Sequence, residues 1–470
     1  MKTGEHCILL YNPISGHGHL DSWHALFAAF LLDRGYRVLA LTPDAHALGE
    51  RLAQRRRAAH PMLQVLDWKA ADRDSLWNKV RRKVRHWRHM LAFFGDLYAN
   101  ERPGSRVTPD MHPLIRSKKR LYQLAVPPVF AVLGPLLGPV SRAPVEEAEH
   151  AAAEAEVHYL RPAEMGRRII AALQRALWQP DFVFNMYMDM FKTGPVAWGR
   201  YDSICRLPWG GIRFVPSAPP YEAYYASPSF RGMCFLDEAA CEDYSRRYPG
   251  KHFQYLPDIT ETSLPAKPGT LARKINQRAA GRKIVFLGGT IGGQKNLARW
   301  YDAIARADPD RWFFVQIGEL VKGMWSAEDA LAFDRIMSQT PDNVLIEPTY
   351  LPDERVFNEI IVTSDILFAV YRDFRISSNM PCKAASFRKP ILVSDRYVMG
   401  ERVTRYGIGL AVPEDDTAKI LEGLERLVRE PIPAENFMNF CRDFSEEATA
   451  RRLDDFLDRC LRDRPLDAVA

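Results

Sequence analysis

Two glycine-rich turns, far apart along the chain, contain side chains suited to chemistry on a small polar ligand. The first turn, SGHGH, holds His17 and His19, and imidazole groups can donate and accept protons near neutral pH. The second, GGTIGGQK, ends in Lys295, whose ammonium can pair with a phosphate. Each turn precedes a helical pattern, so N–H groups at the helix start would also face a ligand. The alternatives are turns that only redirect the chain, surface histidines and a solvated lysine.

A third segment, FRISSNMPCKAASFRKPILVSD, also combines small polar residues with a lysine. Either serine of its SSN run can cap a helix, and proline is tolerated in a helix's first turn. The segment follows an apolar run, so a bound diphosphate could lie against this helix start. The alternative without a ligand is a well-capped helix with an exposed lysine. The residues expected around the anion are Arg372, Asp373, Ser377, Ser378, Asn379 and Lys383.

These segments belong to a pattern of strand, turn, helix and strand that occurs twice in the sequence. Apolar runs predict strands at 7–11, 37–42, 283–287, 312–317, 344–346, 366–370 and 391–393. Amphipathic patterns predict helices at about 21–32 and 296–307. Alternating strands and helices indicate parallel sheets with crossover helices, and two such series indicate two doubly wound α/β domains.

The domain boundaries follow from where this alternation starts and stops. We expect a first domain at 1–265, a second at 275–435 and a C-terminal helix at 440–470 that packs back toward the first. The linker is placed at 258–268, which is rich in Thr, Ser and Pro. Residues from about 67 to 179 do not fit the alternation and are predicted to be a helical insert in the first domain.

The predicted insert contains the chain's excess of positive over negative charge. The whole chain has a net charge of +6, whereas residues 75–120 contain twelve Lys or Arg against three acids. Tryptophans and valines recur at helical spacing in WNKVRRKVRHWRHM, which favours binding to an anionic membrane surface. Residues 121–140 are uncharged and long enough to span a membrane, but four prolines indicate an interfacial or buried segment. A solvated basic helix followed by an apolar loop is the ordinary alternative.

Several classes of protein are disfavoured by composition. The seven cysteines are scattered without CxxC spacing, which argues against a disulfide framework or a zinc site and favours a reducing cytosol. The first residues show no secretory pattern. The basic charge is local and no recognition motif accompanies it, so no nucleic-acid partner is predicted. No metal is predicted at His17 and His19, because no third ligand lies nearby in the sequence.

The chain resembles glycosyltransferases of the GT-B fold, most of all the retaining, nucleotide-sugar-dependent group called family four. The resemblance is best over residues 282–435, in LGGTIGGQKNL, in PDNVLIEPTYLPDERVFNEIIVTSDILFAVYRD and in NMPCKAASFRKPILVSDRYVMGERVTRYGIGLAV. The N-terminal SGHGHLDSWHALFAAFLLDRGYRVLALT is similar to the acceptor-side turn of the same fold. Together these segments cover about half of the chain. The resemblance implies two Rossmann-like domains facing across a cleft.

The resemblance also implies roles for particular residues. Lys295 would bind the donor phosphates and Asp373 the sugar, while His17 or His19 would lie near the acceptor. The residues assigned to the donor are Gly289, Thr290, Gly318, Glu319, Tyr350, Leu351, Arg372, Ser377, Ser378, Asn379 and Lys383. Those assigned to the acceptor are Gly16, Gly18, Asp21 and Asp189. Two positions depart from the family: Thr290 stands where an arginine is usual, and Lys383 where a second glutamate is usual.

These observations predict a glycosyltransferase that moves a sugar from a nucleotide-sugar donor to an acceptor, with retention and without a cofactor or metal. The acceptor is expected to be lipid-linked or otherwise membrane-proximal, as in polysaccharide or glycolipid biosynthesis, and the protein to be cytoplasmic and peripheral on the membrane. Three alternatives stay open: an inverting transferase with His19 or Asp21 as base, a nucleotide-sugar epimerase, and a non-catalytic membrane-associated scaffold.

Overall fold

The computed structural model describes residues 6–15, 20–69, 160–191, 195–215, 223–351 and 353–462. Residues 1–68 and 160–470 form one compact unit, and residues 69–159 form a second. The described part, apart from Lys69, belongs to the first unit. The turn at 16–19 and most of the predicted basic insert lie outside the described residues.

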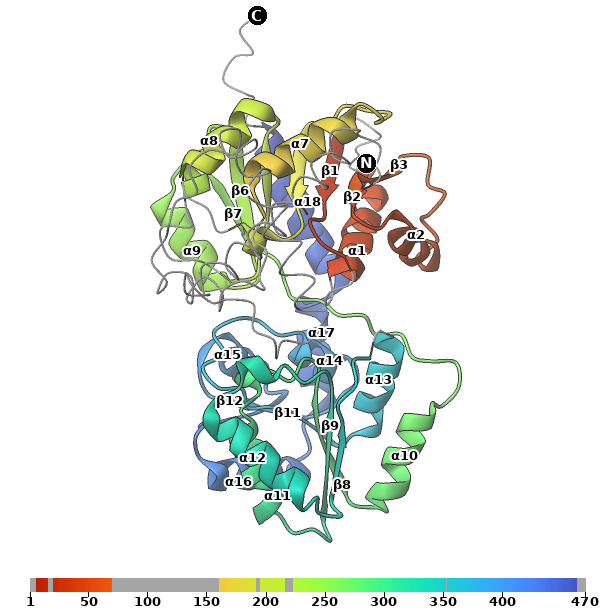
Figure 1. The fold of residues 1–470 in the computed structure, drawn as a ribbon, viewed down its shortest axis with the longest axis vertical. Helices are drawn as coiled ribbons and strands as arrows, with labels where there is room; N and C mark the ends of the chain where they lie inside the picture. Colours follow the sequence, from red (N-terminus) through yellow and green to blue (C-terminus); the bar gives the residue numbers. More distant parts are fainter. Residues whose placement is uncertain are drawn as a thin grey trace, which may run out of the picture. The chain divides into compact units, whose positions relative to one another are not determined.

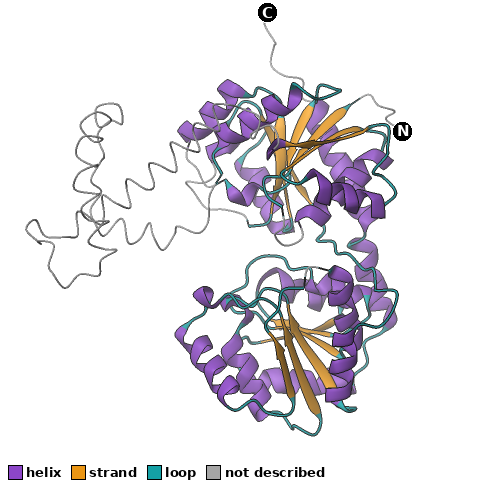
Figure 2. Cartoon of the chain, turned by 45° about the vertical axis from the view of Figure 1, so that its right-hand side comes forward, coloured by secondary structure: helices purple, strands orange, loops and turns teal. Residues whose placement is uncertain are grey.

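Two parallel sheets organise the described chain (Figures 1 and 2). The first has seven strands in the order β3-β2-β1-β4-β5-β6-β7. Their bounds are β1 Cys7–Tyr11, β2 Arg37–Thr42, β3 Leu63–Asp67, β4 Phe182–Asn185, β5 Trp209–Arg213, β6 Phe230–Phe235 and β7 His252–Tyr255.

Helices cover both faces of this sheet, because alternate side chains of each strand point to opposite faces. Ile8 and Leu10 pack with one group of helices: α1 (Leu20–Asp33), α2 (Ala45–Gln54) and α18 (Glu446–Arg462). Leu9 and Tyr11 pack with another: α7 (Pro162–Leu173), α8 (Pro195–Ile204) and α9 (Glu238–Arg247). Two 3-10 turns, η1 (Met188–Met190) and η2 (Ala223–Ala226), lie between these elements. Every residue of β1 and β4 is buried, as expected for a parallel strand covered on both faces.

The second sheet has six strands in the order β10-β9-β8-β11-β12-β13. The strands are β8 Lys283–Gly288, β9 Trp312–Ile317, β10 Val344–Glu347, β11 Ile366–Ala369, β12 Ile391–Ser394 and β13 Gly409–Val412. The helices are α10 Thr270–Ala279, α11 Leu297–Arg306, α12 Ala327–Ser338, α13 Glu354–Thr363, α14 Met380–Ser386, α15 Tyr397–Tyr406, α16 Thr417–Arg429 and α17 Ala434–Asp443. Two further 3-10 turns are η3 Gly293–Lys295 and η4 Lys322–Met324. One continuous apolar core joins sheet and helices.

The prediction of an α/β fold with two doubly wound parallel sheets is confirmed. In each sheet the order runs outward from the first strand in both directions, β1 in one sheet and β8 in the other, so the crossover reverses beside that strand. Ligands of doubly wound proteins bind at such reversal points, beyond the carboxyl ends of the strands. Ligand-binding residues are therefore expected in the loops after β1, β4, β8 and β11.

Two described segments lie at the edges of the predicted domains. Residues 162–173, at the end of the predicted insert, form α7, and Met165, Ile169 and Ala172 on it are buried in the core of the first sheet. Helix α18, at the C-terminal end, packs on α1, β6 and β7. The domain boundaries themselves stay a prediction.

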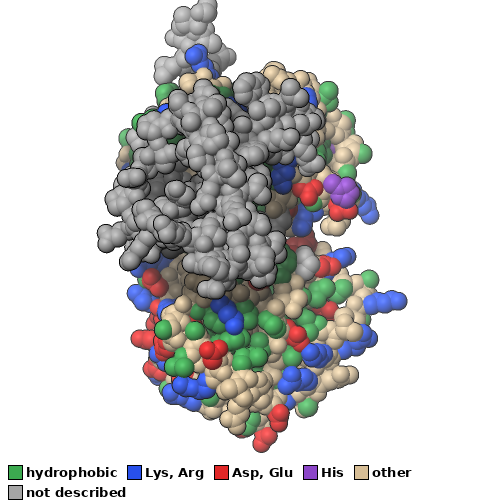
Figure 3. All heavy atoms as spheres, in the orientation of Figure 1, with side chains coloured by type: hydrophobic (Ala, Val, Ile, Leu, Met, Phe, Trp, Pro, Cys, Tyr) green, Lys and Arg blue, Asp and Glu red, His purple; other side chains and the backbone are tan. Residues whose placement is uncertain are grey.

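Within the described part of the chain, no helix is both long and apolar enough to span a membrane. The prolines and the apolar run at 121–140 lie outside that part. On the face shown in Figure 3, the coloured Lys and Arg side chains lie among Asp, Glu and apolar ones. The segment that holds the sequence's excess of positive charge, 75–120, is likewise not among the described residues.

Candidate functional site

A cavity of about 350 Å³ lies at the carboxyl ends of β8, β9 and β11. Its wall combines backbone-rich turns, hydroxyl and amide side chains, and apolar rings. The lining residues are Ser22, Arg51, Gly288, Gly289, Thr290, Gly292, Gln294, Lys295, Ile317, Gly318, Glu319, Met324, Tyr350, Leu351, Glu354, Phe357, Tyr371, Phe374, Ser378, Asn379 and Met380. The cavity therefore occupies the position at which doubly wound folds bind their ligands.

Lys295 presents the main positive charge of the second sheet to this cavity. Its ammonium donates hydrogen bonds to the carbonyl oxygen of Gly288 at 3.0 Å and to the hydroxyl of Tyr371 at 2.7 Å. It also lies 4.0 Å from the centre of the Tyr371 ring. Among the described residues it forms no ion pair, and burial lowers its pKa to about 7. A cation held only by neutral groups in a cavity is a ready partner for an anion.

The loop that carries Lys295 is held in place by Arg372, which forms an ion pair with Asp329. Arg372, directly after Tyr371, donates to Asp329 on α12 and to the carbonyl oxygen of Gly293 at 2.9 Å. The backbone N–H of Arg372 donates to the carbonyl oxygen of Gln294 at 2.9 Å. Arg372 was expected to contact the donor; the structure instead turns it away from the cavity, where it positions the lysine loop.

Two glycines shape the loops after β8 and β9, both through positive φ angles and Gly318 also through a close approach to the Gly289 carbonyl. Gly289 has φ +91° and Gly318 has φ +154°, and both values strongly favour glycine. A Cβ added at Gly318 would lie 1.7 Å from the carbonyl oxygen of Gly289. The loops after β8 and β9 can therefore meet at the cavity only because position 318 lacks a side chain.

Other predicted donor residues lie in the same wall. Thr290, Glu319, Ser378 and Asn379 line it with polar groups, and Leu351 and the half-exposed Tyr350 line it with apolar surface. The N-cap of helix α14 is neither of the serines predicted to cap it but Asn379, the residue after Ser378, and its side chain makes no capping hydrogen bond. The Ser378 hydroxyl accepts a hydrogen bond from the N–H of Met380 at 3.3 Å.

Lys383 and Ser377 do not reach this wall, contrary to expectation. The Lys383 side chain is fully buried and donates to Glu354 at 2.9 Å and to the side-chain oxygen of Asn358 at 2.6 Å. The Ser377 hydroxyl donates to Asp258 at 3.0 Å and accepts from Arg402 at 2.6 Å. Lys383 thus holds Glu354, which does line the cavity.

Asp373 is also absent from the lining. It is exposed, with φ +44°, and its carboxylate accepts hydrogen bonds from Tyr397 at 2.5 Å and from Arg375 at 3.2 Å. These hydrogen bonds, that from Tyr397 first, lower its pKa. In this arrangement Asp373 contacts its neighbours rather than the cavity, so its sugar-binding role stays a prediction.

The acceptor-side candidates that the structure describes both make local contacts. Asp21 is buried and accepts hydrogen bonds from Asn12 at 3.2 Å and Ser15 at 2.9 Å, which secures the loop after β1. Asp189 accepts from the N–H groups of Phe214 at 2.8 Å and Val215 at 2.9 Å. The remaining candidates lie outside the described residues: Gly16, His17, Gly18 and His19.

Several lining residues had no role in the sequence prediction. Tyr371 holds the Lys295 ammonium, and its position next to Arg372 was the available signal. Arg51 and Ser22 reach the cavity from α2 and α1, and no local pattern marks them. Glu354 begins α13 after Asp353, an N-cap whose side chain accepts from the N–H of Arg355. In the described residues no group of three His, Cys, Asp or Glu side chains could hold a metal ion.

Comparisons with known proteins agree with this architecture. No protein-family model and no curated protein matches the chain. Among solved structures, a glycosyltransferase from Rickettsia africae aligns at a TM-score of 0.59 and 9% identity, over 98% of this chain and 100% of that one. HepE of Anabaena, solved with UDP and glucose, aligns at 0.56 and 12%, over 96% and 100%. An α,α-trehalose 6-phosphate synthase from Burkholderia multivorans aligns at 0.55 and 13%, over 97% and 98%.

At these identities the likeness defines the fold. The chain has the two-sheet GT-B architecture of those glycosyltransferases, over nearly its whole length.

Proposed function

We propose that this protein is a glycosyltransferase that takes a sugar from a nucleotide-sugar donor bound in the 350 Å³ cavity. The observation that carries the proposal is the Lys295 ammonium, which lines the cavity and whose partners among the described residues are a carbonyl, a hydroxyl and an aromatic ring. A diphosphate would supply the missing negative charge. The fold supports the same conclusion, because HepE, of the same architecture, was solved with UDP and glucose.

The cavity wall offers a separate group for each part of such a donor. Leu351, Tyr350 and Phe357 provide apolar surface for a base, while Thr290, Ser378 and Asn379 provide groups that can hydrogen-bond hydroxyls. In transfer, the bond between the sugar and the diphosphate breaks, and negative charge grows on the leaving phosphate oxygen. The Lys295 ammonium is placed to stabilise that charge, which lowers the barrier.

We further propose that transfer proceeds with retention: the acceptor oxygen bonds to the sugar on the face from which the diphosphate leaves, and the acceptor's hydroxyl proton passes to the departing phosphate oxygen. The enzyme then needs no nucleophile of its own, and its work is charge neutralisation and positioning. The local hydrogen bonds of Asp21 and Asp189 support this, because both carboxylates already serve loops of the first sheet. His17 and His19 are proposed to contact the acceptor.

The proposals for the acceptor and for the location of the protein rest on the amino-acid sequence. We propose a membrane-proximal acceptor and a cytoplasmic, peripherally bound protein, because residues 75–120 carry twelve basic side chains against three acidic ones. Sedimentation with vesicles containing anionic lipid tests this. We expect binding to weaken with salt and in the triple variant Arg81→Gln, Arg82→Gln, Arg85→Gln. Undiminished binding by that variant would contradict membrane recruitment through these charges.

Binding of nucleoside diphosphates tests the central proposal. Calorimetry with UDP, GDP, CDP, ADP and dTDP should give one clear preference, with UDP the first choice on the HepE precedent. Lys295→Met should weaken that binding about 10- to 100-fold, as expected for loss of a charged hydrogen bond. Lys322→Met is the matched control, because Lys322 sits on the neighbouring turn η4 and does not line the cavity.

Two results would redirect the proposal. If none of the diphosphates or their sugar conjugates binds, the scaffold alternative is favoured. If a nucleotide-sugar binds and is turned over without an acceptor, the epimerase alternative is favoured. Determination of the product's anomeric configuration separates retention from inversion.

A further inference from the structure

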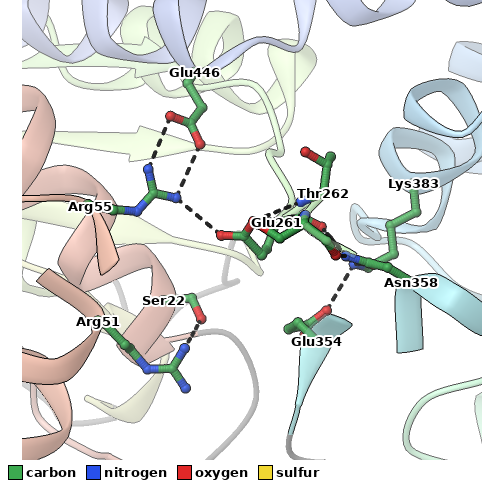
Figure 4. Close-up of polar contacts among 10 residues, drawn as sticks. Ser22, Arg51, Arg55, Glu261, Thr262, Glu354, Asn358, Lys383 and Glu446 are labelled. Carbon is green, nitrogen blue, oxygen red and sulfur yellow. Dashed lines mark hydrogen bonds and ion pairs between the residues drawn. The ribbon is translucent and has the colours of Figure 1, made fainter. Parts of the chain in front are cut away.

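A second cavity, of about 520 Å³, adjoins the first and shares Ser22, Arg51 and Glu354 with it. Its other walls come from α2, from the segment between β7 and α10, and from the start of α13. Figure 4 shows the polar groups around it: Arg51 and Arg55 extend from α2, with Glu261 and Glu354 among the groups opposite. The cavity is lined by both cations and carboxylates, so the pairing of each charge decides what it could bind.

The carboxylates of this cavity have cationic partners. Arg55 contacts Glu446 at 3.2 Å and Glu261 at 3.4 Å. Arg355 contacts Asp353 at 2.8 Å. Arg55 thus faces two carboxylates and Arg355 one, so the positive charge of each is already offset by acidic neighbours.

The two remaining carboxylates are also accounted for. Glu354 accepts from the buried ammonium of Lys383 at 2.9 Å. Glu50 has a side chain 67% exposed to water and lies 3.9 Å from a ring nitrogen of His46. Neither carboxylate is joined to Arg51.

Arg51 is the exception among the charged residues around this cavity. Its only hydrogen bond within the described structure is from Nη1 to the Ser22 hydroxyl oxygen at 2.7 Å, and it forms no ion pair there. A guanidinium is always charged and carries five N–H donors, so most of its donor capacity is unused. Because Ser22 accepts from Arg51, its own O–H is free to donate. Together they present donors on the shared wall of the two cavities.

We propose that Arg51 and Ser22 bind an oxyanion, a phosphate or carboxylate group, carried by the sugar acceptor. The inference rests on the proposed function, in which Lys295 serves the donor's diphosphate in the first cavity. The second cavity has room for an acceptor sugar, since 520 Å³ lies within the range of small-molecule sites. A guanidinium suits either oxyanion, because its planar fork matches their paired oxygens. The acceptor class would then be an anionic sugar.

The same oxyanion could come from the donor, because a diphosphate has two phosphates and Arg51 also lines the donor cavity. The experiment therefore saturates the protein with UDP, or with whichever diphosphate binds best, before the acceptor probes are added. The probes are glucose, glucose 6-phosphate, glucose 1-phosphate and glucuronate, with binding followed by calorimetry. The variants are Arg51→Gln, Arg51→Lys and, as control, Arg56→Gln, which removes an equal charge from an exposed neighbour.

The expected result is that at least one anionic sugar binds the UDP-saturated protein and that glucose binds more weakly. Arg51→Gln should weaken that binding about 10- to 100-fold and should affect UDP affinity much less. Arg51→Lys should recover part of the loss, and Arg56→Gln should behave as wild type. Equal thermal midpoints across the variants confirm that the fold is intact.

Two outcomes would overturn the assignment. If Arg51→Gln weakens UDP itself and no anionic sugar binds the saturated protein, Arg51 belongs to the donor site. If anionic sugars bind equally well to wild type and Arg51→Gln, Arg51 contributes no oxyanion site. Failure of the proposed function would look different: no diphosphate would bind or respond to Lys295→Met, whereas an anionic sugar would still bind in an Arg51-dependent manner.

Discussion

The buried environment of Lys295 makes nucleotide binding depend on pH. In the free protein, burial lowers the pKa of the ammonium to about 7, so about half of the molecules carry a neutral amine at that pH. A bound diphosphate favours the charged form and raises the pKa. Binding should therefore take up a proton, and affinity should fall as pH rises above 7.

The size of the expected change in affinity follows from the protonated fraction of Lys295 at each pH. Between pH 7.0 and pH 8.5 the protonated fraction of a group with a pKa near 7 falls from about one half to about 3%, so the dissociation constant should rise about 15-fold. The terminal phosphate of a nucleoside diphosphate, with a pKa near 6, is already ionised over this range. The lysine is thus the dominant source of the dependence.

Calorimetry in two buffers of different ionisation enthalpy measures both the affinity and the number of protons taken up. Wild type should take up about half a proton at pH 7.0 and close to one at pH 8.5. Lys295→Arg should bind with a flat pH profile, because arginine does not titrate there. Lys295→Met should bind weakly at every pH. A flat wild-type profile with no proton uptake would refute the argument, since it would mean that Lys295 is fully charged before binding.

Three further perturbations test the framework around the site. Asp329→Asn removes the buried partner of Arg372 and should lower the free energy of unfolding by about 1–3 kcal/mol in urea titrations, with weaker nucleotide binding. Glu422→Gln, at an exposed ion pair on α16, should cost under about 1 kcal/mol. Gly318→Ala places a methyl group against the Gly289 carbonyl, so it should abolish nucleotide binding and lower the free energy of unfolding by more than about 2 kcal/mol. Gly323→Ala should change neither, because the space around Gly323 is open. Burial lowers the pKa of His24 to about 3, so below pH 6.5 only the unfolded state binds a proton at this side chain. The free energy of unfolding should therefore fall by about 1.4 kcal/mol for each pH unit below 6.5. An unchanged pH dependence of stability in His24→Leu would show that other groups control it.

The positions of most strands, and the turn that carries Lys295, could be read from the amino-acid sequence. The strands Cys7–Tyr11, Arg37–Thr42 and Trp312–Ile317 lie where the apolar runs placed them, because a strand buried on both faces needs a continuous apolar run. The glycine turn before Lys295 was recognisable for a similar reason. The glycines of this turn and Lys295 lie in one short segment, and the positive φ of Gly289 is a property of the local backbone.

The contacts between polar side chains could not be read from the sequence, because they depend on how distant elements pack. Lys383 was expected at an anion, but its partner Glu354 lies 29 residues away, and the Asp258 that engages Ser377 lies 119 residues away. The Tyr371 that holds Lys295 is 76 residues distant, and Arg51 reaches the same cavity from another sheet's helix. A local pattern predicts which residues are buried and which face a turn. It does not predict the partner of a buried charge, because that partner is determined by how elements distant in the sequence pack together.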